Sequence, residues 1–141
     1  DIAFTTELVK SEEVENIPIM HSRLVLLAST DIDKEKIFDN YLHLDWGNKI
    51  SKKIHSFYPQ TKRARFKSSC INIALKQLKN NFSSIILTEC LVNNYFIPKK
   101  FAFVENIDDV SVPVFLVYLK DTKNTAIADI IDFCQNDLLR L

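Results

Sequence analysis

The stretch YLHLDWGNKISKKIHSFYPQTKRARFKSS, residues 41–69, decides the fold because it contains two successive strand-to-helix transitions. The first leads from the apolar strand YLHL, residues 41–44, through the turn DWGN into a helix that ends near Phe57. The second leads from a basic strand, residues 61–67, into a helix over residues 70–80. In an open parallel sheet both turns lie at the carboxyl ends of strands, where ligands bind and helix N-termini offer N–H groups to anions. The stretch therefore predicts two βα units and a candidate small-molecule site.

Polar and aromatic residues at these strand ends are the candidate ligand contacts. Ser68 and Ser69 could bind a carboxylate at a helix N-terminus, although Ser69 is also the expected N-cap of that helix. Trp46 could form one wall of a pocket or be a half-buried core aromatic with a bonded N–H, and Gly47 permits close approach of the backbone. Three threonines end predicted strands, which could be simple strand termination. The complete set of candidate contacts is Thr5, Thr6, Trp46, Gly47, Asn48, Ser68, Ser69 and Thr88.

The segments before and after this stretch continue the alternation of strands and helices. Upstream, residues 1–6 predict a short buried strand, residues 23–29 a second strand and residues 34–39 a short helix capped by an aspartate. Downstream, the β-branched run 84–88 predicts a strand covered on both faces, followed by a short helix over 89–95. Such alternation favours an α/β protein with a parallel sheet.

The last third of the chain predicts two strands and a helix. Residues 101–104 read as a short edge strand, after which Asp108 and Asp109 turn the chain into a strand over 110–119. Pro113 must lie where no ladder donor is needed, at an edge or a crossing point. The closing helix carries an apolar stripe at helical spacing, formed by Ile127, Ile130, Ile131, Cys134 and Leu138.

Composition excludes several classes of protein. The 141 residues are 47% hydrophobic and 26% charged, which fits one soluble globular domain rather than a disordered chain. Eighteen basic and eighteen acidic side chains give no net positive charge to draw the whole chain to DNA. No apolar run is long enough to span a bilayer. Three widely spaced cysteines predict neither a disulfide framework nor a zinc site, and they indicate a reducing cytoplasm.

Motifs for catalysis, metals and cofactors are missing from the sequence. Gly47 is the sole glycine, which excludes glycine-rich phosphate loops. The histidines lack metal-ligand spacing, and His43, on a strand expected to be buried, is interpreted as a hydrogen-bonded core residue. The acidic residues form no evident acid–base pair. The sequence therefore predicts a protein that is not an enzyme and uses no metal or cofactor.

Two further features have an ordinary interpretation beside a functional one. Cys70 lies in the first turn of a predicted helix, where the dipole can lower a thiol pKa, but a small buried residue is the expected role. Lys62, Arg63 and Arg65 form a basic run that could bind anions. A solvated face or protection of an edge strand is the ordinary explanation for such a run.

Six segments, taken in order, carry a family resemblance that covers nearly the whole chain. They are DIAFTTE at 1–7, RLVLLAS at 23–29, LHLDWG at 42–47, FKSSCINIALKQLKNN at 66–81, IILTECLV at 85–92 and VPVFLVYLKD at 112–121. Their order and spacing resemble the effector-binding domain of LysR-type transcriptional regulators, which has the type 2 periplasmic-binding-protein fold. The chain departs from that pattern in its turns, with Asn80 and Asn81 where a glycine is common and Thr88 and Glu89 where proline-containing turns are common.

The resemblance implies an α/β fold of the periplasmic-binding-protein type 2 kind. A mainly parallel sheet flanked by helices would form the second lobe, over residues 23–119, bounded by crossing strands at about 23–29 and 110–119. Residues 1–22 would be a remnant of lobe one with a linker, and residues 120–141 a helix that returns to lobe one.

The resemblance also implies a function. The chain would be a cytoplasmic ligand-sensing module that binds a small-molecule effector between two lobes and contacts DNA only through a winged helix-turn-helix domain outside this sequence. The full-length protein would be a homodimer or homotetramer, with no membrane contact. A solute-binding protein of a transport system with the same fold is the alternative, followed by an enzyme on a flavodoxin-like sheet.

Overall fold

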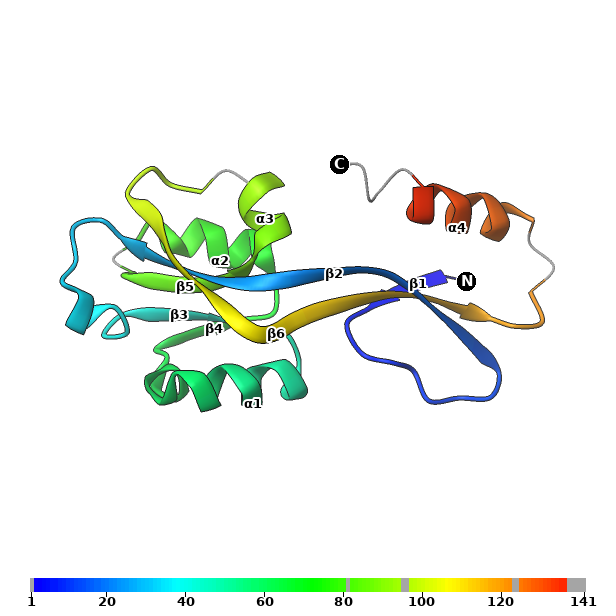
Figure 1. The fold of residues 1–141 in the computed structure, drawn as a ribbon, viewed down its shortest axis with the longest axis horizontal. Coiled ribbons are helices and arrows are strands. Elements are labelled where there is room, and N and C mark those ends of the chain that lie inside the picture. Colours follow the sequence, from blue (N-terminus) through cyan, green and yellow to red (C-terminus); the bar gives the residue numbers. More distant parts are fainter. Residues whose placement is uncertain (1, 81, 95–96, 123–124, 137–141) are drawn as a thin grey trace. The chain divides into compact units, whose positions relative to one another are not determined.

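The chain divides into two compact units in the computed structural model, which describes residues 2–80, 82–94, 97–122 and 125–136. Unit 1 comprises residues 1–21 and 113–141, and unit 2 comprises residues 22–112. Strands β2 (Val14–Ser29) and β6 (Phe101–Leu119) each contribute residues to both units (Figure 1). The strand order is β1-β6-β2-β5-β3-β4.

The three βα strands of unit 2 are parallel and adjacent. Strand β3 (Tyr41–Leu44) pairs with β4 (Phe66–Ser68) on one side and β5 (Ser84–Thr88) on the other, both in parallel. Strand β2 pairs with β5 in the antiparallel direction. The predicted α/β fold with a sheet flanked by helices is confirmed, and the sheet is mixed, because β2 and β1 make antiparallel pairs.

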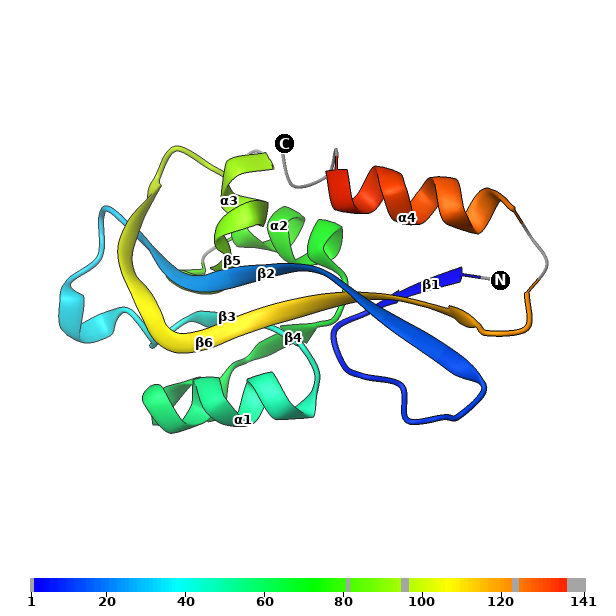
Figure 2. The same cartoon turned by 45° about the vertical axis from the view of Figure 1, so that its right-hand side comes forward.

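Helices cover both faces of the sheet in unit 2. Helix α1 (Asn48–Phe57) lies on one face, and α2 (Ile71–Leu78) and α3 (Glu89–Asn94) lie on the other (Figures 1 and 2). Because side chains alternate along a strand, β2 sends Leu24 and Leu26 into the core cluster under α1 and the intervening residues into the cluster under α2. Strand β5 is buried along its whole length, as its β-branched run predicts.

Unit 1 has a smaller core. Strand β1 (Ile2–Thr5) pairs antiparallel with the last part of β6, from Ile2 opposite Tyr118 to Thr5 opposite Phe115. Helix α4 (Ala126–Asn136) contributes Cys134 to a buried cluster with Ile19 and Leu116. The prediction of a buried first strand is wrong: β1 is an edge strand and the side chain of Phe4 is 58% exposed.

The apolar stripe of α4 is only partly buried. Ile127 and Cys134 are buried and Ile131 packs against the cluster, but Ile130 is exposed. Leu138 lies outside the described residues, as does Tyr95 at the end of the predicted 89–95 helix. None of the described helices is long and apolar enough to cross a bilayer.

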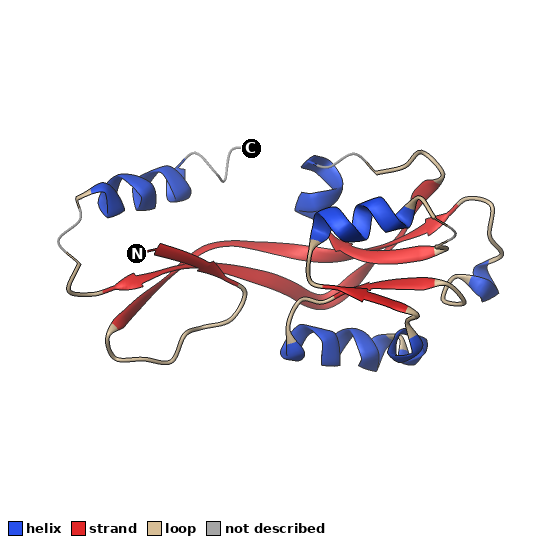
Figure 3. Ribbon diagram, turned by 180° about the vertical axis from the view of Figure 1, so that it is seen from behind, coloured by secondary structure: helices blue, strands red, loops and turns tan. Residues whose placement is uncertain are grey.

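Several predicted boundaries are wrong for local reasons (Figure 3). Residues 61–63, predicted to begin a strand, belong instead to a 3-10 helix over Pro59–Arg63, because the Thr61 hydroxyl donates to the carbonyl of Tyr58 at 2.6 Å and stabilises the turn. Asp108 and Asp109 do not turn the chain but continue strand β6. The predicted 34–39 helix is a single 3-10 turn, Lys34–Lys36, for which no aspartate side chain caps the amino end.

Candidate functional site

Six of the eight predicted contacts lie at one edge of the sheet in unit 2. Because β5, β3 and β4 are parallel neighbours, their carboxyl ends lie together, and α3, α1 and α2 follow them directly. Register places Leu44 opposite Ser68, and the backbone N–H of Asp45 donates to the carbonyl of Ser68 at 2.8 Å. These contacts join the β3–α1 turn to the β4–α2 turn, as predicted for the 41–69 stretch.

Thr5 and Thr6 belong to unit 1 and are not part of this edge. The Thr5 hydroxyl donates to the carbonyl of Glu7 at 2.8 Å, a local bond that ends β1. Thr88 lies at the edge but is buried, and its hydroxyl accepts a long hydrogen bond, 3.4 Å, from the N–H of Leu91 at the start of α3. Thr5 and Thr88 thus differ in setting although each ends a strand.

Ser68, rather than Ser69, organises the start of α2. The Ser68 hydroxyl oxygen accepts from the N–H of Cys70 and donates to the carbonyl of Cys70, both at 3.1 Å. The predicted N-cap is therefore wrong: Cys70 is the N-cap, and its carbonyl accepts from the N–H of Ala74 at 3.0 Å. Ser69 is exposed. Cys70 is also exposed, which corrects the expectation of a buried thiol.

Asp45 closes the turn that leads into α1. Its Oδ1 accepts from the N–H of Gly47 at 2.9 Å and from the hydroxyl of Ser51 at 3.1 Å. Gly47 has φ 88° and ψ 163°, a conformation essentially restricted to glycine. Asn48 is exposed and begins α1. The sequence pattern of an aspartate two residues before a glycine could have predicted this turn.

Trp46 contacts the core clusters on both sides of the sheet. The indole is partly buried and packs against the residues under α1 and those under α2. Its Nε1 is buried and has no hydrogen-bond partner among the described residues. Leaving a buried donor unpaired costs about 1–3 kcal/mol. Trp46 is therefore a half-buried core aromatic, as one interpretation had it, but the expectation that its N–H is hydrogen-bonded is wrong.

A chain of hydrogen bonds runs from the core to Asp45. Tyr41 and His43, both buried on β3, are joined from the tyrosine hydroxyl to Nδ1 at 3.3 Å, and His43 Nε2 lies 3.3 Å from the hydroxyl of Ser51. Because Ser51 gives its one hydroxyl proton to Asp45, Nε2 of His43 must carry a hydrogen and Nδ1 must accept from Tyr41. The expected role of His43 as a hydrogen-bonded core residue is confirmed.

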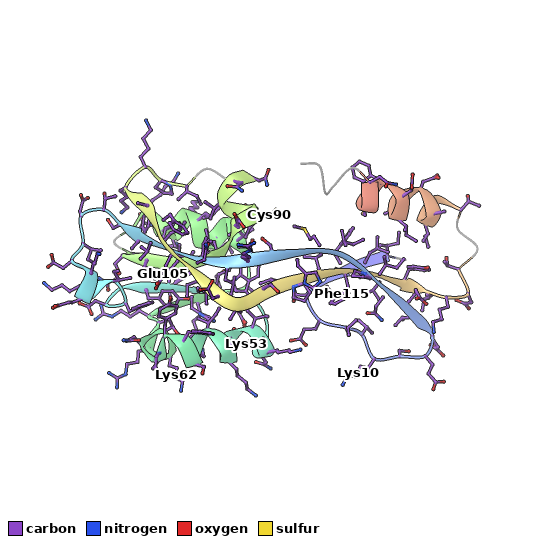
Figure 4. The ribbon with its side chains drawn as sticks, viewed as in Figure 1. Lys10, Lys53, Lys62, Cys90, Glu105 and Phe115 are labelled. Carbon is purple, nitrogen blue, oxygen red and sulfur yellow. The ribbon has the colours of Figure 1, made fainter. Side chains whose placement is uncertain are left out.

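Burial keeps both histidines of this region neutral at pH 7. Desolvation, followed by the proximity of His55, lowers the pKa of His43 to about 4. Desolvation, followed by Lys67 and Lys62, lowers the pKa of His55. The ring of His55 is held by Thr61. Because the Thr61 hydroxyl donates its proton to the carbonyl of Tyr58, its oxygen must accept from the Nδ1–H of His55, at 2.7 Å. Lys53 and Lys62 lie on the α1 side of unit 2 (Figure 4).

The sequence between Asp45 and Glu89 contains no acidic residue. It holds seven lysines and two arginines, and every one of them is exposed. The zero net charge of the whole chain hides this separation of charge, which the basic run at 62–65 signals only in part. The nine basic residues are Lys49, Lys52, Lys53, Lys62, Arg63, Arg65, Lys67, Lys76 and Lys79. The candidate edge therefore lies in a region whose own charges attract anions.

A hollow of about 510 Å³ lies elsewhere in unit 2. Its lining comes from residues that precede β3 or follow α1, so it is near the amino end of β3 rather than its carboxyl end. The lining residues are Glu35, Phe38, Asp39, Pro59, Gln60 and Arg63. Among the described residues, no group of three His, Cys, Asp or Glu side chains is placed to hold a metal ion.

Comparison with solved structures identifies the fold. The regulatory domain of CrgA, a LysR-type transcriptional regulator from Neisseria meningitidis, has a TM-score of 0.72 at 18% identity, covering 98% of this chain and 75% of that one. This chain has the fold of a LysR-type regulatory domain. The CcmR regulatory domain from Synechocystis PCC6803, in complex with 2-PG, gives 0.68 at 10% identity, over 98% of this chain and 74% of that one.

Longer regulators match over a smaller share of their length. The OxyR C206 mutant of Corynebacterium glutamicum has a TM-score of 0.67 at 13% identity, covering 99% of this chain and 48% of that one. This chain thus spans about half the length of such regulators. The predicted type 2 periplasmic-binding-protein-like fold is confirmed. The sequence itself matches no family model and no curated protein.

Proposed function

We propose that this chain is the effector-sensing part of a LysR-type transcriptional regulator. The observation that carries the proposal is the fold match over 98% of the chain to the CrgA regulatory domain. The six segments that resemble the family in sequence support it independently, because they occur in the family's order. Such a regulator would work in the cytoplasm and contact DNA through a winged helix-turn-helix domain.

The proposed effector is a small anionic metabolite that binds at the carboxyl ends of β3 and β4. Ser69 and the amino end of α2 would donate hydrogen bonds to it, because no acidic side chain occupies the first turn of that helix. At the amino end of α1 the Asp45 carboxylate already accepts from the N–H of the N-cap residue Gly47 and from the Ser51 hydroxyl, and its negative charge would repel an anion there. The unpaired N–H of Trp46 is a further candidate donor. Thr88, Gly47 and Asn48 complete this proposed half-site in unit 2, and Thr5 and Thr6 of unit 1 are not needed for it.

The proposed mechanism is a population shift. An effector that binds one arrangement of the domain more tightly than another changes their ratio, and linkage then changes the affinity for DNA by the same factor. A homodimer or homotetramer of the full-length protein would present two or more DNA-binding domains together. The ligand would thus act on regulation without contacting DNA.

A thermal-shift screen tests the proposal. Small carboxylates and phosphate esters, together with 2-PG, would be added to the purified chain. A ligand at one hundred times its dissociation constant stabilises by about 2.7 kcal/mol, which raises the melting temperature by several degrees. Ser69→Ala should weaken that shift, and Ser56→Ala, the same change at an exposed position of α1, should not. If no compound raises the melting temperature, or if Ser69→Ala leaves a shift intact, the proposed site is wrong.

The coding sequence upstream of Asp1 separates this proposal from the alternative. A helix-turn-helix would support the regulator. A signal peptide would support a solute-binding protein of a transport system, which shares the fold.

A further inference from the structure

We propose that His43 and Ser51 are positioning residues: the hydrogen-bond chain Tyr41–His43–Ser51–Asp45 fixes the β3–α1 loop that carries Trp46 at the candidate effector site. The inference rests on the proposed function only in naming what the loop contacts. This hydrogen-bond chain links residues of a buried strand, a helix and an exposed turn, and the Ser51 hydroxyl is the side-chain group of α1 that bonds the Asp45 carboxylate.

The exposed end of the hydrogen-bond chain, at Asp45, depends on Ser51. The carboxylate of Asp45 is exposed, and its Oδ1 accepts from the Gly47 N–H within the turn and from the Ser51 hydroxyl on α1. The first bond shapes the turn, whereas the second holds the turn against the helix. Without the Ser51 side chain the turn would keep its internal bond and the backbone bond from the Ser51 N–H to the Gly47 carbonyl, but Asp45 would lose its side-chain bond to α1.

The buried end of the hydrogen-bond chain, at Tyr41 and His43, determines which group donates in each bond. His43 is 3% exposed, so its side chain has little contact with bulk water. Tyr41 donates to Nδ1, Nε2–H donates to Ser51, and Ser51 donates to Asp45, so each hydroxyl proton is used once. Both contacts of His43, at 3.3 Å, are at the long end for hydrogen bonds. The complete series of hydrogen bonds requires a neutral His43 with its hydrogen on Nε2.

Breaking the middle link leaves two groups unpaired. In Ser51→Ala, the Nε2–H of His43 loses its acceptor in the core, and the Asp45 carboxylate loses its partner on α1. The first loss is costly because an unpaired buried donor keeps its desolvation penalty. The loop would then relax, and Trp46, next to Asp45, would move with it.

Trp46 reports this movement without a ligand, because it is the sole tryptophan of the chain. We expect Ser51→Ala to shift its emission maximum to longer wavelength and to raise the acrylamide quenching constant about twofold, as for a local opening. Ser56→Ala, on the same helix but exposed, is the matched control and should leave both unchanged. Ser51→Thr, which keeps the hydroxyl, should restore both values. A purely structural role would lower the melting temperature but leave the Trp46 spectrum of the folded state unchanged, so an unchanged spectrum in Ser51→Ala with a native circular dichroism spectrum overturns the proposal.

A second measurement uses the unmodified protein, in case Ser51→Ala fails to fold. Long-range nitrogen–hydrogen NMR of the imidazole rings distinguishes the two neutral tautomers. At pH 7 the proposal requires the Nε2–H form for His43, while the contacts of His55 require the Nδ1–H form there. An Nδ1–H or doubly protonated His43 would contradict the proposed hydrogen-bond chain. Neither experiment uses an effector, so failure of the effector screen leaves this inference intact, and the reverse is also true.

Discussion

The imidazole rings of His43 and His55 are stacked, with centroids 5.2 Å apart and planes inclined by 28°. One ring comes from strand β3 and the other from helix α1, so the stack joins the sheet to the helix that covers it. Two protonated rings at this distance would repel each other inside a region of low polarity. The packing of α1 on β3 therefore disfavours protonation of both rings at once.

Stability should fall as the solution becomes acidic. The titratable groups near His43 are Tyr41, His55, Asp45 and Lys67. Burial, followed by His55 and Lys67, lowers the folded pKa of His43 to about 4, against 6.5 in the unfolded chain, although Asp45 acts in the opposite direction. The unfolded state therefore binds more protons between these values, so stability is lost as pH falls from 6.5 through 4. The loss from His43 has an upper limit of about 3 kcal/mol. Urea unfolding at a series of pH values would measure it.

The matched variants for the pH series are His43→Phe and His21→Gln. His43→Phe keeps an aromatic ring in the stack but cannot take a proton, so its stability should vary less between pH 6.5 and 4. His21 is exposed in unit 1, and its replacement should leave the pH dependence unchanged. Identical pH profiles for wild type and His43→Phe would show that His43 is not the group that senses acid.

Truncation of the isoleucine that anchors α1 should destabilise the protein strongly. Ile54 is fully buried between the helix and the sheet, so Ile54→Ala leaves a cavity and should cost about 2–5 kcal/mol. Ile73→Ala makes the same change on α2, where the side chain is 51% exposed, and should cost less than about 1 kcal/mol. Denaturant midpoints of the two variants give the comparison, and equal losses would mean that α1 does not pack as described.

Cys70 and Cys134, whose thiols differ most in exposure, should react at very different rates. Cys70 is exposed at the start of α2, whereas Cys134 is buried in the core of unit 1. A thiol reagent such as dithionitrobenzoate should therefore label Cys70 within the folded protein and Cys134 only after unfolding. Cys70→Ser should remove the rapid phase and Cys134→Ser should preserve it. A rapid phase that survives Cys70→Ser would assign it to Cys90 instead.

The parts of the fold that the sequence predicts are those with strong local periodicity. The strand at 41–44 matches the structure to the residue, and the helix predicted to end near Phe57 does end there, because the apolar pattern, the turn glycine and the following proline all agree. Strand β6 could not be predicted as continuous, because two aspartates in succession usually end a strand and only its pairing in the sheet overrides that preference.

The position of the candidate site could be predicted from the sequence, but its hydrogen-bond network could not. Parallel strand order brings the turns after β3 and β4 together, and the sequence alternation is enough to indicate that. The link from His43 to Ser51 depends on the rotation of α1 over β3, which no periodicity encodes. Asp45 lay within the quoted turn, yet only the structure shows that its carboxylate is used internally rather than offered to a ligand.

Replacement of the sole glycine should disturb the same loop from the backbone side. Gly47 has a positive φ of 88°, and its N–H donates to Asp45, so a Cβ at this position forces the turn out of its conformation. Gly47→Ala should therefore cost about 1–3 kcal/mol and shift the emission of Trp46, its neighbour, to longer wavelength. Asn48→Ala, one residue further on and exposed, is the control and should do neither. If Gly47→Ala keeps the wild-type unfolding midpoint and Trp46 emission, the turn does not depend on its positive φ, and its shape must then come from Asp45 and Ser51 alone.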